Sequence, residues 1–501
     1  MDPSETLILI GNTFTRIPPT SQQLIDLLPK RYQLANPIPI ASDIQTATDA
    51  QVPNLPPEPQ LCDIQQYQLL QQIKDGFDNP NFTDARNRAN PYENIGKSIF
   101  MNRAAIKIAN VDAIYNLSNT FGGLLKPRTD GRFTFCDVAA GPGGFSQYIQ
   151  YRQREGVGYG MTLRSPPHPI VNLIETRDYY GALTRIFESP ENVAKVDAAL
   201  TEATKETGRN VNVTINELHQ LWETKNTAEI DKLLTGNLGY IIRDSLGRDY
   251  LDWNWPLLDM RRMNLIYGPD GTGNLYTNWK TFVQSVRSIE ISGVDLVTAD
   301  GGFDVEQVET GDPTKAGAEA AANFKRQEFL SSRLLLCQIL IAISTLTEGG
   351  TFMVKLFDTV TSLSAQLLFI LALSFNEITI FKPISSRPAN AERYMVCKGL
   401  RKNALDYAPL LEQANNSYKD GINVTNILAG GLTSLPADYI AWLRELNQLS
   451  MDRQILASSR IVRLLAGENV EAEIPKYDLS KALIIWNLPD NTIGRRSLIR
   501  V

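Results

Sequence analysis

Residues 133–149 read Phe-Thr-Phe-Cys-Asp-Val-Ala-Ala-Gly-Pro-Gly-Gly-Phe-Ser-Gln-Tyr-Ile, and this stretch decides the expected fold. Residues 133–138 are a short apolar run typical of a buried strand. Residues 141–144 are a glycine-rich turn, and an amphipathic helix is predicted from Phe145. In an open parallel sheet, ligands bind outside the carboxyl ends of the strands, where glycines let the backbone approach the ligand. The stretch therefore predicts an α/β fold with a ligand site at this turn.

The spacing of the glycines differs from that of a dinucleotide site. A Rossmann phosphate loop reads Gly-x-Gly-x-x-Gly, with an acidic residue about 20 positions later, whereas the turn here has Gly141, Gly143 and Gly144. Asp137 ends the strand, where its carboxylate could accept from an ammonium or a hydroxyl group, and Pro142 stiffens the loop. These features favour a zwitterion, such as the methionine end of S-adenosylmethionine, over a pyrophosphate. A turn of this kind is also often purely structural.

The composition is that of an ordinary soluble protein. The 501 residues are 43% hydrophobic and 21% charged, which leaves room for two or three folding units. No apolar run reaches the roughly 18 residues that a membrane span needs. The N-terminus lacks the basic start and the apolar stretch of a signal peptide. An intracellular protein without a membrane partner is expected.

Cysteine and histidine are too scarce and too scattered to predict a metal site. The four cysteines lie far apart, and the two histidines, His168 and His219, have no zinc-ligand spacing with them or with each other. Both histidines are more readily interpreted as solvated surface residues than as general bases. The sequence therefore predicts neither a metal nor histidine chemistry.

Two basic runs stand out against a net charge of −6. That balance argues against a protein that binds nucleic acid over its whole surface, so local patches must supply positive potential. Residues 382–402 carry six basic residues against one acidic residue, and residues 86–107 carry five against one. Such runs are commonly solvated faces. Their positions on both sides of the glycine turn favour a role in binding a polyanion.

Strands alternate with helices along the chain, which predicts a doubly wound sheet. Beyond the opening strand and helix, strands are expected at residues 157–163, 294–299, 350–357, 377–381 and 393–398, and helices at residues 97–117, 324–347 and 363–375. A further strand is expected at residues 6–10.

The same pattern divides the chain into four parts. Residues 1–60 are rich in Pro and Gln after the first strand and predict an extended or weakly ordered arm. Residues 61–164 and 266–402 form the predicted catalytic domain. Residues 165–265 are too long for a compact crossover and predict an inserted, mostly helical subdomain. Residues 403–501 predict a helical C-terminal module for docking or for an interface.

Four charged residues lie where chemistry is expected. Asp300 ends a strand on the carboxyl side, and Glu392 precedes the last strand. Lys355 lies inside an apolar strand and Lys107 on an apolar stretch of helix, where a charge must find partners or lose its proton. Each residue alone is better explained by a structural salt bridge.

Together, the four residues suit removal of a proton from a weakly acidic hydroxyl whose oxygen attacks a methyl group. A lysine is a base only if its pKa falls from about 10.4 towards neutrality, which burial and a neighbouring cation can cause. Lys107 is the expected neighbouring cation of Lys355. Asp300 and Glu392 would orient the ammonium groups.

These residues resemble the Lys-Asp-Lys-Glu arrangement of FtsJ-like ribose 2′-O-methyltransferases, and most closely that of the cap-1 mRNA 2′-O-methyltransferases of eukaryotes and their large DNA viruses. The resemblance covers about residues 86–164 and 266–402 and, more faintly, residues 430–490. The segments that carry it are Asp137 to Ser146, Asp300-Gly301-Gly302, Lys355, Asn90-Pro91-Tyr92-Glu93, Asn102-Arg103-Ala104-Ala105-Ile106-Lys107, Gly160-Met161-Thr162-Leu163 and Ser386-Arg387-Pro388-Ala389-Asn390-Ala391-Glu392-Arg393-Tyr394.

The resemblance implies a Rossmann-like S-adenosyl-L-methionine methyltransferase fold with helices on both faces of the sheet. It implies methyl transfer from S-adenosyl-L-methionine to the 2′-hydroxyl of the first transcribed nucleotide of m7G-capped RNA. The catalytic positions would be Lys107, Asp300, Lys355 as proton acceptor, and Glu392. The cofactor-binding positions would be Asn102, Asp137, Ala139, Ala140, Gly141, Pro142, Gly143, Gly144, Phe145, Asn274 and Leu275. Arg86 and Asn390 match positions that touch capped RNA.

One position departs from the family pattern. Near residues 273–275 the family usually has Gly-Asp-Ile, and this chain has Gly-Asn-Leu. Asn274 therefore keeps a side-chain acceptor but loses the charge of an acidic cofactor ligand.

Other functions stay open at this point. The chain could methylate another RNA, such as ribosomal RNA, or it could be a catalytically idle cap-binding or structural subunit. An NAD-dependent oxidoreductase is disfavoured because the dinucleotide spacing is absent. Capped mRNA is the expected partner, other capping or transcription proteins are further candidates, and no oligomeric state is predicted. The expected compartment is the nucleus for a cellular protein, and the host cytoplasm or the virion for a viral one.

Overall fold

The structure is a computed structural model. The residues that it describes are 6–10, 13–17, 30–35, 37–49, 51, 57–93, 96, 98–118, 131–139, 141–164, 174, 178–205, 213–235, 237–246, 258–302, 327–474 and 479–488.

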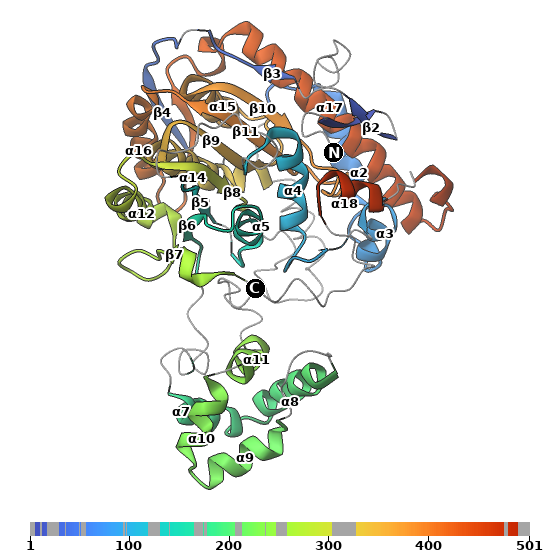
Figure 1. Ribbon diagram of the computed structural model, residues 1–501. Helices are drawn as coiled ribbons and strands as arrows, with labels where there is room; N and C mark the ends of the chain where they lie inside the picture. The colour runs from blue at the N-terminus through green and yellow to red at the C-terminus, as the bar shows by residue number, and fades with distance from the viewer. Residues whose placement is uncertain are drawn as a thin grey trace.

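An eight-stranded mixed sheet forms the centre of the protein (Figure 1). In spatial order its strands are β3 (Arg31–Tyr32), β10 (Phe375–Phe381), β11 (Arg393–Leu400), β9 (Leu346–Leu356), β8 (Val294–Ala299), β5 (Thr134–Val138), β6 (Val157–Met161) and β7 (Met263–Leu265). The run from β9 to β7 is parallel, and β11, β10 and β3 continue the sheet with antiparallel pairing. The carboxyl ends of β5, β8 and β9 therefore lie side by side at one edge.

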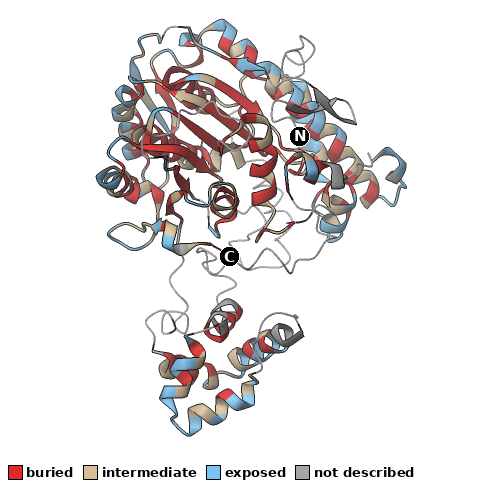
Figure 2. Ribbon diagram, in the orientation of Figure 1, coloured by how far each residue is buried: buried red, intermediate tan, exposed pale blue. Residues whose placement is uncertain are grey.

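Alternate side chains of the central strands enter two hydrophobic clusters, one on each face of the sheet. In β5, Cys136 and Val138 belong to the first cluster and Phe135 to the second. The helices that contribute to the first include α12 (Leu275–Ile289), α14 (Ser332–Thr345) and α15 (Ser362–Ser374), and those of the second include α4 (Ala104–Tyr115), α5 (Gly144–Arg152) and α18 (Leu479–Ile485). Figure 2 shows the buried strands between these helices. The predicted Rossmann-like α/β fold is confirmed.

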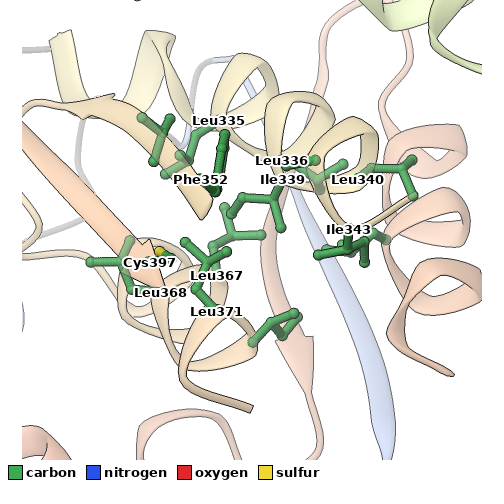
Figure 3. Packing of buried hydrophobic residues seen from close by; sticks show 14 of the residues in the cluster. Leu335, Leu336, Ile339, Leu340, Ile343, Phe352, Leu367, Leu368, Leu371 and Cys397 are labelled. Carbon is green, nitrogen blue, oxygen red and sulfur yellow. The ribbon is translucent and has the colours of Figure 1, made fainter. Parts of the chain in front are cut away.

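The first cluster owes its size to two helices that are apolar nearly all round. Leu336 and Ile339 of α14 and Leu367 and Leu371 of α15 pack against the sheet without solvent exposure (Figure 3). The side chain of Thr361 accepts from the backbone of Ser364, which caps α15 at its first turn. None of the helices in the described ranges is long and apolar enough to cross a membrane.

The boundaries of several elements differ from those expected. The strand expected at 350–357 begins at Leu346, directly where α14 ends, and the helix expected at 97–117 begins only at Ala104. The helix expected at 324–347 is described from residue 327 onwards, with α14 itself at 332–345. Apolar periodicity identifies an element more reliably than its ends, which depend on capping contacts.

Several described segments of the expected N-terminal arm form strands. β1 (Thr6–Ile10) and β2 (Thr13–Ile17) form a hairpin, β3 pairs with β10 at the sheet edge, and β4 (Ser42–Thr48) pairs with β12 (Ile422–Leu428). Tyr32 of β3 is buried against the rings of Tyr439 and Trp442. These contacts order residues whose composition is that of a linker.

The C-terminal region also contributes to the main core. Its helices are α16 (Ala408–Ser417), α17 (Ala437–Leu465) and α18, and Tyr439 and Leu443 of α17 belong to the first cluster. α17 packs along α2 (Ile64–Asp75) and α3 (Phe82–Arg88). Part of the region expected to be a docking module therefore packs into the main core.

The long insertion contains helices with a hydrophobic cluster of their own (Figures 1 and 2). These are α7 (Tyr179–Phe187), α8 (Pro190–Lys205), α9 (Ile215–Glu223), α10 (Thr227–Leu234) and α11 (Asn237–Leu246). Thr214 and Glu217 form a capping box that starts α9. Residues 252–256, which read Asp-Trp-Asn-Trp-Pro, lie outside the described residues.

Candidate active site

The four charged residues singled out in the sequence meet at the carboxyl edge of the sheet. They are Asp300 after β8, Lys355 in β9, Glu392 before β11 and Lys107 on α4. Lys107 Nζ donates to Glu392 Oε2 at 2.8 Å, and Lys355 Nζ lies 3.3 Å from Asp300 Oδ1. Two ion pairs thus form one alternating cluster.

Electrostatics couple the two pairs. Burial disfavours the charge of Lys107, but the carboxylates of Glu392 and Asp300 outweigh it and raise the pKa of Lys107. Burial likewise opposes ionisation of Glu392, yet Lys107 and Lys355 hold the pKa of its carboxyl well below the ordinary value. Lys107 is therefore an ammonium at neutral pH.

Two hydroxyl groups orient the carboxylates of the cluster. Tyr394 Oη donates to Asp300 Oδ1 at 2.8 Å, and Ser386 Oγ donates to Glu392 Oε1 at 2.7 Å. Tyr394 lies opposite Lys355 in the β11–β9 pairing. Sequence reasoning missed both roles, although the alternation of residues along β11 could have placed Tyr394 on the face that bears Lys355.

A third lysine supports the loop that precedes Glu392. Lys382, the residue after β10, donates at 2.8 Å to the carbonyl oxygens of Asn390 and Glu392 and to Asn390 Oδ1. Burial lowers the pKa of Lys382 to about 7. In the sequence, Lys382 was one member of a basic run and carried no assigned role.

Of the two residues expected to touch RNA, Asn390 adjoins the cluster and Arg86 lies on α3. The Arg86 guanidinium carbon lies 5.2 Å from the centre of the Phe82 ring. Ala85 of α3 and Ala89, the residue after α3, share a hydrophobic cluster with Ala389, which places this helix near the loop of Asn390.

Asp137 faces inward rather than towards the open end of the sheet. Its carboxylate accepts from Ser146 N at 2.9 Å, from Ser146 Oγ at 2.7 Å and from Thr298 Oγ1 at 2.9 Å. Burial raises the pKa of Asp137 to about 7. The contacts give this residue a structural task, because they join β5 to the start of α5 and to β8.

The glycine turn is packed closely against neighbouring segments. Gly141 N donates to Thr162 Oγ1 at 3.0 Å, and a Cβ on Gly144 would lie 2.2 Å from Asn102 Oδ1. Gly143, the residue before α5, has a φ of 106°, and no side chain caps this helix. Phe145 is buried in the second cluster. Ala140 lies outside the described residues.

Asn274 and Leu275 begin α12 on the other side of Thr162. Asn274 Oδ1 accepts from Tyr276 N at 2.9 Å and is the N-cap of α12. A Cβ on Gly273 would lie 1.8 Å from the carbonyl oxygen of Thr162, and Leu275 is buried in the first cluster. Thr162 thus contacts both the glycine turn and the residue before the Asn274 cap.

Among the residues that the structure describes, no group of three or more His, Cys, Asp or Glu side chains could hold a metal ion.

Comparisons with known proteins place this site in a family. The model of the FtsJ-like methyltransferase family matches residues 100–400. The chain is 29% identical over 434 residues to a human protein, 30% identical over 434 residues to a mouse protein and 27% identical over 453 residues to a Drosophila melanogaster protein. All three are named cap-specific mRNA (nucleoside-2′-O-)-methyltransferase 1.

The matches cover most of this chain but less than half of the relatives. The matches to the human and mouse proteins span 83% of this chain, and the match to the Drosophila protein spans 86% of it. They cover 41% of the human protein, 40% of the mouse protein and 45% of the Drosophila protein. Among solved structures, a Plasmodium falciparum protein described as a ribosomal RNA methyltransferase matches with 14% sequence identity and a TM-score of 0.28. The match covers 60% of this chain and 98% of that chain.

Proposed function

Because the chain belongs to the FtsJ-like methyltransferase family, we propose that it transfers methyl from S-adenosyl-L-methionine to a ribose 2′-hydroxyl, namely that of the first transcribed nucleotide of m7G-capped RNA. The observation that carries the proposal is the cluster of two ion pairs at the carboxyl edge of β8 and β9. The names of the relatives favour capped mRNA as the substrate class.

Proton removal is the task of the cluster in this proposal. A ribose hydroxyl bound beside Lys355 would lose its proton to the Lys355 amine while its oxygen bonds to the methyl carbon, and the bond from that carbon to the sulfonium sulfur would break with its electron pair going to sulfur. Asp300 holds the Lys355 nitrogen in place, and Tyr394 holds Asp300. Lys107 contributes positive potential that stabilises the developing alkoxide.

The turn and its neighbours fit the cofactor. S-adenosyl-L-methionine supplies an electrophilic methyl group on a sulfonium when it is bound. The carboxylate of the cofactor could accept hydrogen bonds from the N–H groups in the first turn of α5, because this helix follows a glycine and has no side-chain cap. The segments expected to hold it, at Asn102, the glycine turn and Asn274, converge around Gly144 and Thr162.

Mass analysis of RNA incubated with the protein and S-adenosyl-L-methionine tests the proposal. A capped transcript should gain one methyl group on its first nucleotide, and a matched transcript with a 2′-deoxy first nucleotide should gain none. An uncapped transcript separates the alternatives: methylation at an equal rate would indicate an enzyme for other RNA. Binding of capped RNA without any methylation would indicate an idle subunit.

A further inference from the structure

Lys382 holds both ends of a short segment that carries two functional candidates. Its ammonium group donates to the carbonyl oxygen and the side-chain oxygen of Asn390, and to the carbonyl oxygen of Glu392. All three distances are 2.8 Å. A protonated lysine has three N–H donors, one for each of these acceptors.

These contacts fix the backbone of residues 390 to 392. With the backbone on both sides of Ala391 attached to one nitrogen, the direction in which the Glu392 side chain leaves the chain is set. Ser386 then holds one carboxylate oxygen of Glu392 and Lys107 the other. Moving the backbone at Glu392 would move the partner of Lys107.

The hydrogen bonds of Lys382 are made to the loop rather than to the carboxylate of Glu392. Burial is the main cause that lowers the pKa of Lys382 to about 7; Glu392 raises this pKa, whereas Arg393 and Lys107 lower it. Lys382 has no hydrogen bond to either Glu392 carboxylate oxygen among the contacts of the described residues. It acts on that residue through the backbone.

We propose that Lys382 is a positioning residue that couples the RNA-contacting side of the loop, at Asn390, to the catalytic side, at Glu392. The inference rests on the proposed function. One buried contact set then determines both how the RNA is held and how the cluster of lysines and carboxylates is assembled.

The variant Lys382→Met tests the coupling, with Lys398→Met as its matched control. Lys398 is a lysine on the neighbouring strand β11, near the Tyr115 ring and away from the loop. With capped RNA, Lys382→Met should lower kcat about 10- to 100-fold, because small misplacements of catalytic groups are costly. It should raise KM for RNA about fivefold, the equivalent of roughly one hydrogen bond. The affinity for S-adenosyl-L-methionine should not change, and Lys398→Met should resemble the wild type.

A double-mutant cycle with Asn390→Ala separates positioning from a general loss of structure. If Lys382 acts through Asn390, the two changes raise KM by less than the product of their separate effects. Lys382→Gln, which keeps two N–H donors, should recover part of kcat and serves as the test variant if Lys382→Met does not fold.

The outcomes distinguish the positioning role of Lys382 from the proposed function. A wild-type kcat in Lys382→Met, independent effects in the cycle, or an equal loss of cofactor affinity would overturn the positioning role alone. A wild-type protein that methylates no capped RNA would overturn the proposed function and this inference with it.

Discussion

Lys107 Nζ and Glu392 Oε2 lie 2.8 Å apart although 285 positions separate the two residues in the chain. The side chains are 19% and 10% exposed, so the pair is largely removed from water. It joins α4 to the segment before β11, and it closes the cluster begun by Lys355 and Asp300.

Glu392→Gln should destabilise the fold by about 3 kcal/mol, since removing one partner of a buried ion pair leaves the other charge uncompensated. The free energy of unfolding in urea measures this effect. Glu377→Gln is the matched control, because the pair of Glu377 with Arg31 involves an arginine that is 46% exposed and should contribute about 0 to 1 kcal/mol. Equal losses in the two variants would show that Lys107 keeps a compensating partner.

The stability of the wild type should fall in acid more steeply than that of Glu392→Gln. The pKa of the Glu392 carboxyl is lowered in the fold: burial opposes its ionisation, but Lys107 and Lys355 favour it more strongly. Its contribution is present above the unfolded value of 4.5 and is lost as the pH falls through the folded pKa. The thermal unfolding midpoints of the wild type and of Glu392→Gln, measured against pH, should therefore converge in acid and differ most near neutrality.

Lys355→Met should reduce kcat roughly 10²- to 10⁴-fold, the usual contribution of a positioned acid or base. Lys355→Arg should reduce kcat equally far, because a guanidinium keeps the charge but does not lose its proton in proteins. Single-turnover assays with capped RNA measure the rates, and calorimetry should show unchanged binding of S-adenosyl-L-methionine. An active Lys355→Arg variant would assign Lys355 an electrostatic role instead.

Asn274 offers a test of the cofactor side of the site. Asn274→Ala should lower the free energy of unfolding by about 1 kcal/mol, because α12 loses its N-cap. Asn274→Asp keeps the cap and restores the charge usual in the family, so stability should be unchanged and S-adenosyl-L-methionine should bind more tightly. Weaker binding by the aspartate variant would indicate that the Asn274 amide faces the cofactor as a donor.

Local patterns in the sequence determined the fold class and the four residues of the cluster. Buried parallel strands are continuous apolar runs, so β5, β8 and β9 were recognisable without partners. A lysine or a carboxylate at the end of such a run is conspicuous because burying an unpaired charge is costly. For that reason Asp300 and Lys355 could be predicted from their immediate neighbours.

Only the tertiary structure decided which groups these residues meet. The Lys107–Glu392 pair, the contact of Tyr394 with Asp300 and the three bonds of Lys382 depend on sheet register and on the path of the loop before β11. Asp137 also needed the structure, because its inward direction follows from donors on α5 and β8. Hydrogen-bond partners far apart in the chain leave no local pattern, whereas burial of an apolar strand does.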